Sequence, residues 1–113
     1  MTLCALGFAE EFREAGIASN ALWPRTLVAT AAVQNLLGGD EAMARARKPE
    51  IYSDAAYAIL NRPSREYTGN AALCEDVLVE EGVTDFSDYA YGDGKDLGVD
   101  LYVDSANPPG VAA

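Results

Sequence analysis

A short apolar run, Ile17 to Trp23, lies between a glycine and a proline and sets the tightest limit on the fold. A glycine such as Gly16 readily adopts the left-handed backbone that ends many helices, and Pro24 cannot donate a backbone hydrogen bond to a neighbouring strand. The length and composition of the run suit a strand that is covered on both faces. We therefore predict a buried strand that follows a helix and leaves its sheet at Pro24.

The residues before Gly16 predict an amphipathic helix over 1–15. Their larger apolar side chains recur at intervals of three and four, whereas charged side chains share the other side near the end of the segment. The apolar face of this helix is expected to comprise Met1, Cys4, Phe8 and Phe12.

Three helices are expected after the first strand. The pair Gly38-Gly39 interrupts residues 31–47 and is interpreted as a hinge between two short helices, with Asp40 as the N-cap of the second. Pro49 suits the first position of a longer helix that stops before Pro63. One face of this longer helix comprises Ile51, Ala55, Ala58 and Ile59.

A second buried strand is predicted over Tyr67 to Cys74, although periodicity alone leaves open a helix over Ala71 to Val79. Asp76 is expected to cap a short helical turn that runs to Glu81. The order helix, strand, helix, helix, strand implies a parallel crossover with helices on both faces. We therefore predict an α/β fold with two parallel strands. Their unpaired edges would leave the isolated chain marginally stable or prone to associate.

Length and charge exclude several classes of function. At 113 residues the chain fits one small domain, and its apolar fraction of 50% is typical of a globular protein. Eighteen acidic against eight basic side chains give a net charge of −10, which disfavours binding to nucleic acid. No apolar run is long enough to cross a membrane, and the first residues lack the cationic region of a signal peptide. We therefore expect a cytoplasmic chain.

No metal site is predicted. Cys4 and Cys74 lie far apart in a sequence without histidine, and both are interpreted as buried, reduced thiols. Four aspartates near the end lack the spacing of an EF-hand and are interpreted as a solvated acidic segment. These are Asp93, Asp96, Asp100 and Asp104.

Several motifs together resemble the short-chain dehydrogenase/reductase family, close to its hydroxysteroid-dehydrogenase-like branch. The stretch Asn20-Ala-Leu-Trp-Pro24 is similar to the end of the sixth strand of that family, and Pro24-Arg-Thr-Leu-Val-Ala-Thr30 is similar to its cofactor loop. The loop departs from the usual Pro-Gly-x-Val-x-Thr pattern, because Arg25 replaces the glycine and one extra residue precedes Thr30. Further matches are Leu37-Gly-Gly39, Asp54-Ala-Ala-Tyr57 and Thr68-Gly-Asn70.

This resemblance implies a partial Rossmann-like fold, the C-terminal part of a doubly wound parallel sheet, over residues 1–91. Residues 92–113 would form an acidic tail that contains glycine and proline, mobile over Ala106 to Ala113. The family uses NAD or NADP as its coenzyme. Its hydride transfer acts on an alcohol or a carbonyl.

The resemblance also assigns a binding site. Pro24, Thr26 and Val28 would line the nicotinamide side, which agrees with the position of ligands beyond the carboxyl ends of parallel strands. Without the resemblance, Pro24 would merely end a strand and Thr26 cap a helix. The segment Ala31 to Arg47 would be the mobile lid over the substrate. A basic cluster suits either this lid or a solvent-facing helix end, and it comprises Arg45, Arg47 and Lys48.

The catalytic serine, tyrosine and lysine of the family and its Gly-rich phosphate loop have no counterpart in this sequence. Met1 aligns a few residues beyond the family's lysine, so the chain is expected to begin immediately after the active site. Tyr57 and Tyr67 are not followed by lysine at the required spacing and are interpreted as half-buried packing residues. No catalytic residue is therefore assigned, and we expect no coenzyme binding or catalysis by this chain alone.

Two hypotheses of function follow. The chain is a fragment of an NAD(P)-dependent short-chain oxidoreductase, or it is a non-enzymatic association module. In the second case it would pair with a copy of itself or with a separate amino-terminal half, because strand edges and a helix face are left unpaired. The sequence leaves the substrate open, as well as the choice between NAD and NADP.

Overall fold

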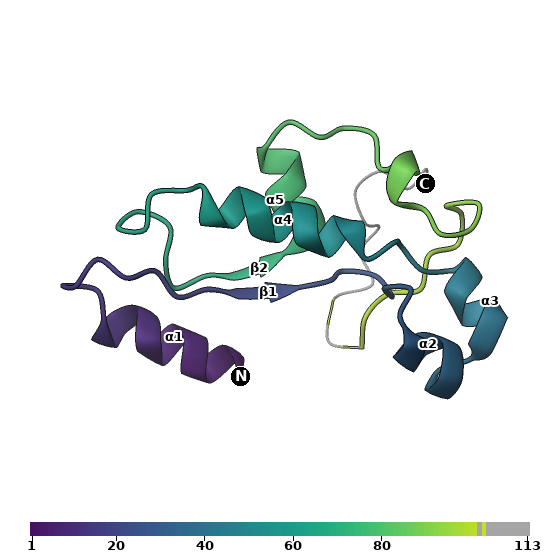
Figure 1. Cartoon of the computed structure of the whole chain (residues 1–113), viewed down its shortest axis with the longest axis horizontal. Helices are drawn as coiled ribbons and strands as arrows, with labels where there is room; N and C mark the ends of the chain where they lie inside the picture. The colour runs from purple at the N-terminus through teal and green to yellow at the C-terminus, as the bar shows by residue number, and fades with distance from the viewer. Residues whose placement is uncertain (102, 104–113) are drawn as a thin grey trace.

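Two short parallel strands form the centre of the computed structural model, which describes residues 1–101 and 103. β1 (Ala21–Trp23) pairs with β2 (Ala71–Leu73) in the register Ala21 with Ala71 and Trp23 with Leu73. Both strands run in the same direction in Figure 1, and the connection between them passes through three helices. The predicted α/β fold with a parallel crossover is confirmed.

Helices lie on both sides of the two strands and beyond their carboxyl ends (Figure 1). α1 (Thr2–Glu11) lies on one side, and α4 (Glu50–Leu60) and α5 (Cys74–Glu80) lie on the other. The pair α2 (Ala31–Leu36) and α3 (Gly39–Ala44) lies past the end of β1. A 3₁₀ turn, η1 (Ser87–Tyr89), follows α5.

The core is formed between α4, α5 and the strands. Its buried members are Ile51, Ala55, Cys74, Val77, Leu78 and Phe86. Ala58 and Ile59 of α4 pack against this cluster, so the face predicted for this helix is confirmed. Burial of these apolar side chains is the main force that holds α4 and α5 to the sheet.

The helix before Gly16 forms, but the apolar face predicted for it is wrong. Ala9 is its one buried residue, whereas Met1, Phe8 and Phe12 are exposed. The contact with β1 includes a hydrogen bond of 3.0 Å from the Trp23 indole to the Thr2 hydroxyl. Helical spacing groups side chains on one face, but it does not decide which face meets a neighbour.

The predicted helix ends also differ in detail from the structure. The N-cap positions of α3 and α5 belong to Gly38 and Leu73, and both Asp40 and Asp76 lie inside the first turn of their helices. In the first turn, the negative charge of an aspartate interacts favourably with the positive end of the helix dipole, although its side chain does not cap the helix. Pro49 occupies the N-cap of α4 rather than its first helical position.

Two packing predictions are wrong as well. Cys4 is exposed, although Cys74 is buried as expected. Tyr57 is exposed on the outer face of α4, whereas Tyr67 is half-buried. No sequence period distinguishes these positions, because exposure depends on which segments cover the helix.

Part of the segment assigned to the acidic tail packs against the rest of the chain. Leu97 is buried, and Val99 forms an antiparallel bridge with Thr26. The Thr26 segment is therefore supported by residues that follow η1. The predicted mobile stretch Ala106 to Ala113 lies outside the described residues.

Gly92 marks the closest backbone approach around α3. A Cβ atom at this position would lie 2.3 Å from the Ala44 carbonyl oxygen and 3.1 Å from its Cα atom. Backbone atoms cannot move aside as a flexible side chain can, so only glycine fits here.

Replacement of Gly92 by alanine should therefore destabilise the fold. Because the backbone of Ala44 must shift, Gly92→Ala is expected to lower the free energy of unfolding by about 1–3 kcal/mol in urea denaturation. Gly7→Ala is the matched control, since a Cβ atom at Gly7 meets nothing within 4 Å in the exposed part of α1. The control should gain about 0.5–1 kcal/mol. Equal stabilities of Gly92→Ala and the unmodified chain would contradict the steric argument.

Candidate functional site: the loop after the first strand

The candidate site is the loop that leaves β1 at its carboxyl end. Pro24 and Val28 are half-buried, and Thr26 is buried with 1% of its surface exposed. Backbone hydrogen bonds of 2.8 and 2.9 Å join Leu27 and Arg25 to the segment that contains Gly98 and Asp100. The loop is thus fixed along one side, and Thr26 contributes to that attachment through its bridge with Val99.

A pocket of about 530 Å³ lies beside the start of this loop. It is lined mainly by side chains of β1 and α1, together with Pro24 and Tyr52. The Tyr52 hydroxyl donates a hydrogen bond to the Leu22 carbonyl oxygen across β1, and burial raises the pKa of this phenol. Pro24 therefore faces a concave, largely apolar surface at the end of the strand.

α2 and α3 form a helical hairpin beyond the loop, which we call the lid. The Thr30 hydroxyl accepts a hydrogen bond of 3.4 Å from the Val33 amide and caps α2. Gly38 and Gly39 have φ angles of 136° and 61°, which L-residues with side chains rarely adopt. The predicted glycine turn between two short helices is confirmed.

A buried ion pair lies at the base of the lid. The Arg47 Nε and Glu75 Oε1 atoms are 3.4 Å apart, and their side chains are 2% and 1% exposed. The Arg47 Nη1 atom donates to the Phe86 carbonyl oxygen at 3.3 Å, and its guanidinium lies 5.1 Å from the centre of the Phe86 ring. These contacts join the end of the lid to α5 and to the segment before η1.

Burial affects both members of this pair. Desolvation raises the pKa of Glu75, and the nearby Arg47 charge opposes this effect in part. Desolvation likewise lowers the pKa of Arg47, against the attraction of Glu75. A single buried charge without its partner is costly, so removal of either side chain should cost about 3–5 kcal/mol.

Sequence reasoning missed this pair. Arg47 was assigned to the lid or to a solvent-facing helix end, and Glu75 received no role. A signal was nevertheless present, because Glu75 directly follows the apolar segment of β2, at the same sheet end where Pro24 leaves β1. Glu75 is buried at this sheet end, where it pairs with Arg47.

Arg25, which replaces the usual glycine of the family loop, attaches the loop to α5. Its Nη2 atom lies 2.8 and 2.9 Å from the two carboxylate oxygens of Asp76. The Arg25 amide also donates to Glu75 at 3.3 Å. Glu75 therefore contacts the loop and the base of the lid at once.

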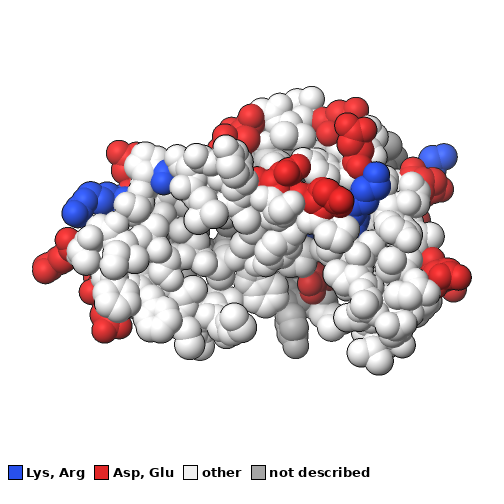
Figure 2. All heavy atoms as spheres, viewed as in Figure 1, with Lys and Arg blue, Asp and Glu red and all other residues white. Residues whose placement is uncertain are grey.

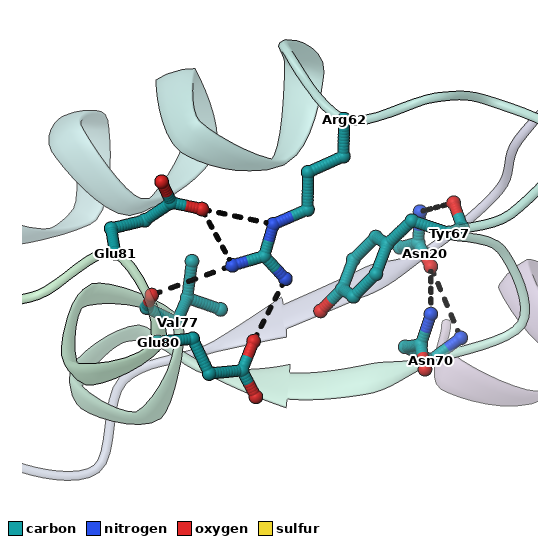
Figure 3. A network of polar contacts seen from close by, with 7 residues as sticks. All are labelled: Asn20, Arg62, Tyr67, Asn70, Val77, Glu80 and Glu81. Atoms are coloured by element: carbon teal, nitrogen blue, oxygen red, sulfur yellow. Dashed lines mark hydrogen bonds and ion pairs between the residues drawn. The ribbon is translucent and has the colours of Figure 1, made fainter.

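A second polar network lies at the opposite ends of the strands (Figure 3). Arg62 donates to Glu80 and Glu81 at 2.9 Å each, and its guanidinium stacks on the Tyr67 ring at 4.4 Å. Nearby, the Asn20 side chain accepts from Asn70 at 2.9 Å. This network joins the segment after α4 to the end of α5, away from the loop, and we assign it a structural role.

Acidic side chains gather over α4 and the segment around η1, above the largely uncharged surface of α1 (Figure 2). Within the described residues, no three histidine, cysteine, aspartate or glutamate side chains are arranged to hold a metal ion. Asp96 instead pairs with Arg45 at 3.3 Å, and Asp104 lies outside the described part. Nor does any helix in residues 1–101 have the length and apolar character needed to span a bilayer.

Comparison with known proteins finds similar short-chain dehydrogenases. No protein-family model matches the sequence. A crystal structure of a short-chain dehydrogenase from Mycobacterium thermoresistibile is 75% identical, with a TM-score of 0.84, over 97% of this chain and 39% of that one. Over nearly its whole length, this chain is similar to part of a short-chain dehydrogenase. A crystal structure of a dehydrogenase from Xanthomonas campestris is 43% identical, with the same TM-score of 0.84 over 93% of this chain and 38% of that one.

Curated relatives agree with this similarity. Hydroxysteroid dehydrogenase-like protein 2 of Danio rerio is 48% identical over 104 residues, which are 92% of this chain and 24% of the relative. The human protein of the same name is 43% identical over 104 residues, again 92% of this chain and 24% of the relative. The chain therefore spans about a quarter of these relatives' length.

Cys74, next to the buried ion pair, should be chemically inert. It is fully buried, and this burial raises the pKa of its thiol to about 12, so almost no reactive thiolate forms near neutral pH. At pH 8, iodoacetamide is expected to modify Cys4 alone in the native chain, as read by mass spectrometry. Both cysteines should react in guanidinium chloride. Equal modification of the two thiols in the native chain would show that Cys74 is accessible.

Proposed function

We propose that this chain forms one wall of the nicotinamide coenzyme site of a short-chain oxidoreductase that acts on an alcohol or a carbonyl. One observation carries the proposal. The loop after β1 lies at the carboxyl end of a parallel strand, next to the α2–α3 hairpin, in a chain 75% identical to a solved short-chain dehydrogenase. This is the end of a parallel sheet at which ligands bind.

The three residues assigned from the family contribute to this wall in different ways. Pro24 faces the apolar pocket, and Val28 is half-buried at the foot of the lid. Both positions suit contact with the flat, uncharged nicotinamide ring of the reduced coenzyme. Thr26 is buried and bridged to Val99, which favours a role in holding the loop in shape. The NAD(P) pyrophosphate would bind elsewhere, because no Gly-rich phosphate loop occurs in this sequence.

The chain by itself should be inactive. Its one Tyr-x-x-x-Lys spacing, Tyr91 to Lys95, lies in an exposed, non-helical segment after η1, so it does not supply the helical pair that would move the proton during hydride transfer. Its Tyr52 phenol is engaged with the backbone of β1 and has a raised pKa, so it is a poor general base near neutral pH. We expect the purified chain to show no saturable NADH or NADPH binding by calorimetry.

A chimera tests the wall directly. This chain would replace the matching segment of the Mycobacterium thermoresistibile short-chain dehydrogenase, whose remaining sequence would complete the fold. The chimera should bind NADH or NADPH, as monitored by nicotinamide fluorescence, and should reduce members of a panel of aldehydes and ketones. A folded chimera that binds neither coenzyme would refute the proposal.

Val28→Asp in the chimera should weaken coenzyme binding. An aspartate at the foot of the lid would place a charge against the uncharged ring, and we expect the Kd to rise at least about tenfold. Val79→Asp is the matched control, because Val79 is exposed on α5. Its Kd should stay unchanged, and equal effects of the two variants would contradict a contact at Val28.

A second candidate function, association, is favoured by the exposed apolar surface of α1. Met1, Leu3 and Phe8 are 107%, 84% and 50% exposed, and Figure 2 shows little charge over this part of the helix. β1 also has one edge that is not paired within the described residues. A second copy of the chain, or a complementary amino-terminal segment, would cover both features.

Sedimentation velocity tests this second candidate. At micromolar concentration the chain is expected to sediment as a dimer or larger species, and Leu3→Glu with Phe8→Glu should shift it to the monomer, because charges oppose burial of the face. Leu60→Glu is the control, since Leu60 is 83% exposed at the end of α4. A folded monomer of the unmodified chain would exclude self-association and leave the complementary segment as the remaining partner.

A further inference from the structure

We propose that Arg47 and Glu75 form a clasp that holds the lid closed at its base, so that the α2–α3 hairpin moves as one unit. Its effect on catalysis rests on the coenzyme site proposed above. The clasp itself is a property of this chain and can be measured without a coenzyme. Arg47 and Glu75 are positioning residues in this proposal, since they act on the loop rather than on a substrate.

Backbone hydrogen bonds bring the two ends of the lid together. The Arg47 amide donates to the Leu27 carbonyl oxygen, and the Ala29 amide donates to the Arg47 carbonyl oxygen, each at 2.8 Å. Val28 and Arg47 thus pair as a parallel bridge, although the whole hairpin lies between them in the sequence. Arg47 forms a second, antiparallel bridge with Ala90. It lies between the candidate loop and the segment after η1.

The other attachments of the hairpin also lie near the end of α3, where Gly98 donates to the Arg45 carbonyl oxygen at 2.9 Å and Tyr91 donates to the Ala46 carbonyl oxygen at 3.2 Å. α2 and α3 pack chiefly against each other, with Val33 and Ala42 buried between them. Their connection carries two glycines in the left-handed region, and Leu36 and Leu37 are exposed. A two-helix unit that is joined to the body mainly at its base can swing only as far as that base permits.

The ion pair makes the base rigid. Two short backbone hydrogen bonds alone would open readily, since such bonds contribute little net free energy in water. The Arg47 side chain instead enters the interior, where it meets the Glu75 carboxylate and the Phe86 carbonyl oxygen. Opening the base would expose a buried charge to solvent or leave it buried without its partner. The pair therefore restrains the two bonds that close the lid.

Glu75 also connects the clasp to the proposed coenzyme wall. Its second carboxylate oxygen accepts from the Arg25 amide at 3.3 Å, while its first faces Arg47. One carboxylate thus fixes the start of the candidate loop and the end of the lid. Any shift of the lid base would be transmitted to the loop at Arg25, within one residue of Pro24.

Hydrogen exchange followed by NMR tests the clasp on this chain. Glu75→Gln keeps the shape of the side chain but removes the charge that faces Arg47. The exchange rates of the Ala29 and Arg47 amides are expected to rise at least about tenfold relative to the amides of α4. Glu81→Gln is the matched control on the same region of the chain, since Glu81 pairs with Arg62 away from the lid. It should leave that ratio unchanged.

Three outcomes would overturn the clasp: no change in the ratio for Glu75→Gln, a parallel rise in α4, or the same rise in Glu81→Gln. If Glu75→Gln does not fold, the double variant Arg47→Met with Glu75→Leu replaces it. Two apolar side chains at these positions leave no buried charge without a partner. The same selective rise at Ala29 is expected there, and its absence would refute the proposal. Because no coenzyme is used, a negative result leaves the proposed coenzyme wall untouched, and failure of the chimera leaves the clasp untouched.

Discussion

The parallel alignment of β1 and β2 is the constraint on which the rest of the structure depends. Because the two strands run in the same direction, their carboxyl ends meet at one edge of the sheet. Pro24 follows β1 there, and Glu75 lies in the first turn of α5 there. The loop, the lid and the buried ion pair are all arranged around this meeting point. An antiparallel pairing would have separated Pro24 from Glu75 by the length of the sheet.

Charge is used in different ways at the two ends of the sheet. At the carboxyl ends, Arg47 and Glu75 are almost fully buried and connect the lid to the body. At the opposite ends, Arg62 meets two partly exposed glutamates and stacks on Tyr67 (Figure 3). Solvent screens the second set, so its contribution to stability is small compared with the cost of disrupting the first.

Much of the fold could be predicted from the sequence, because local signals were strong. Gly16 has the left-handed φ angle of 73°, Pro24 ends β1, and the Ile51 face of α4 is buried. The errors share one cause. The exposed side of α1, the exposed Tyr57 and the exposed Cys4 depend on which segments lie opposite, and periodicity carries no information about the neighbour.

The sequence by itself determined the order of helices and strands, the glycine turn of the lid and the resemblance to short-chain dehydrogenases. These follow from backbone preferences and short motifs, which act over a few residues. Only the tertiary structure decided that Arg47 turns inward to Glu75 and that Arg25 pairs with Asp76. Those contacts join residues far apart in the chain. Their free energy comes from burial and charge pairing, which exist only after the strands have aligned.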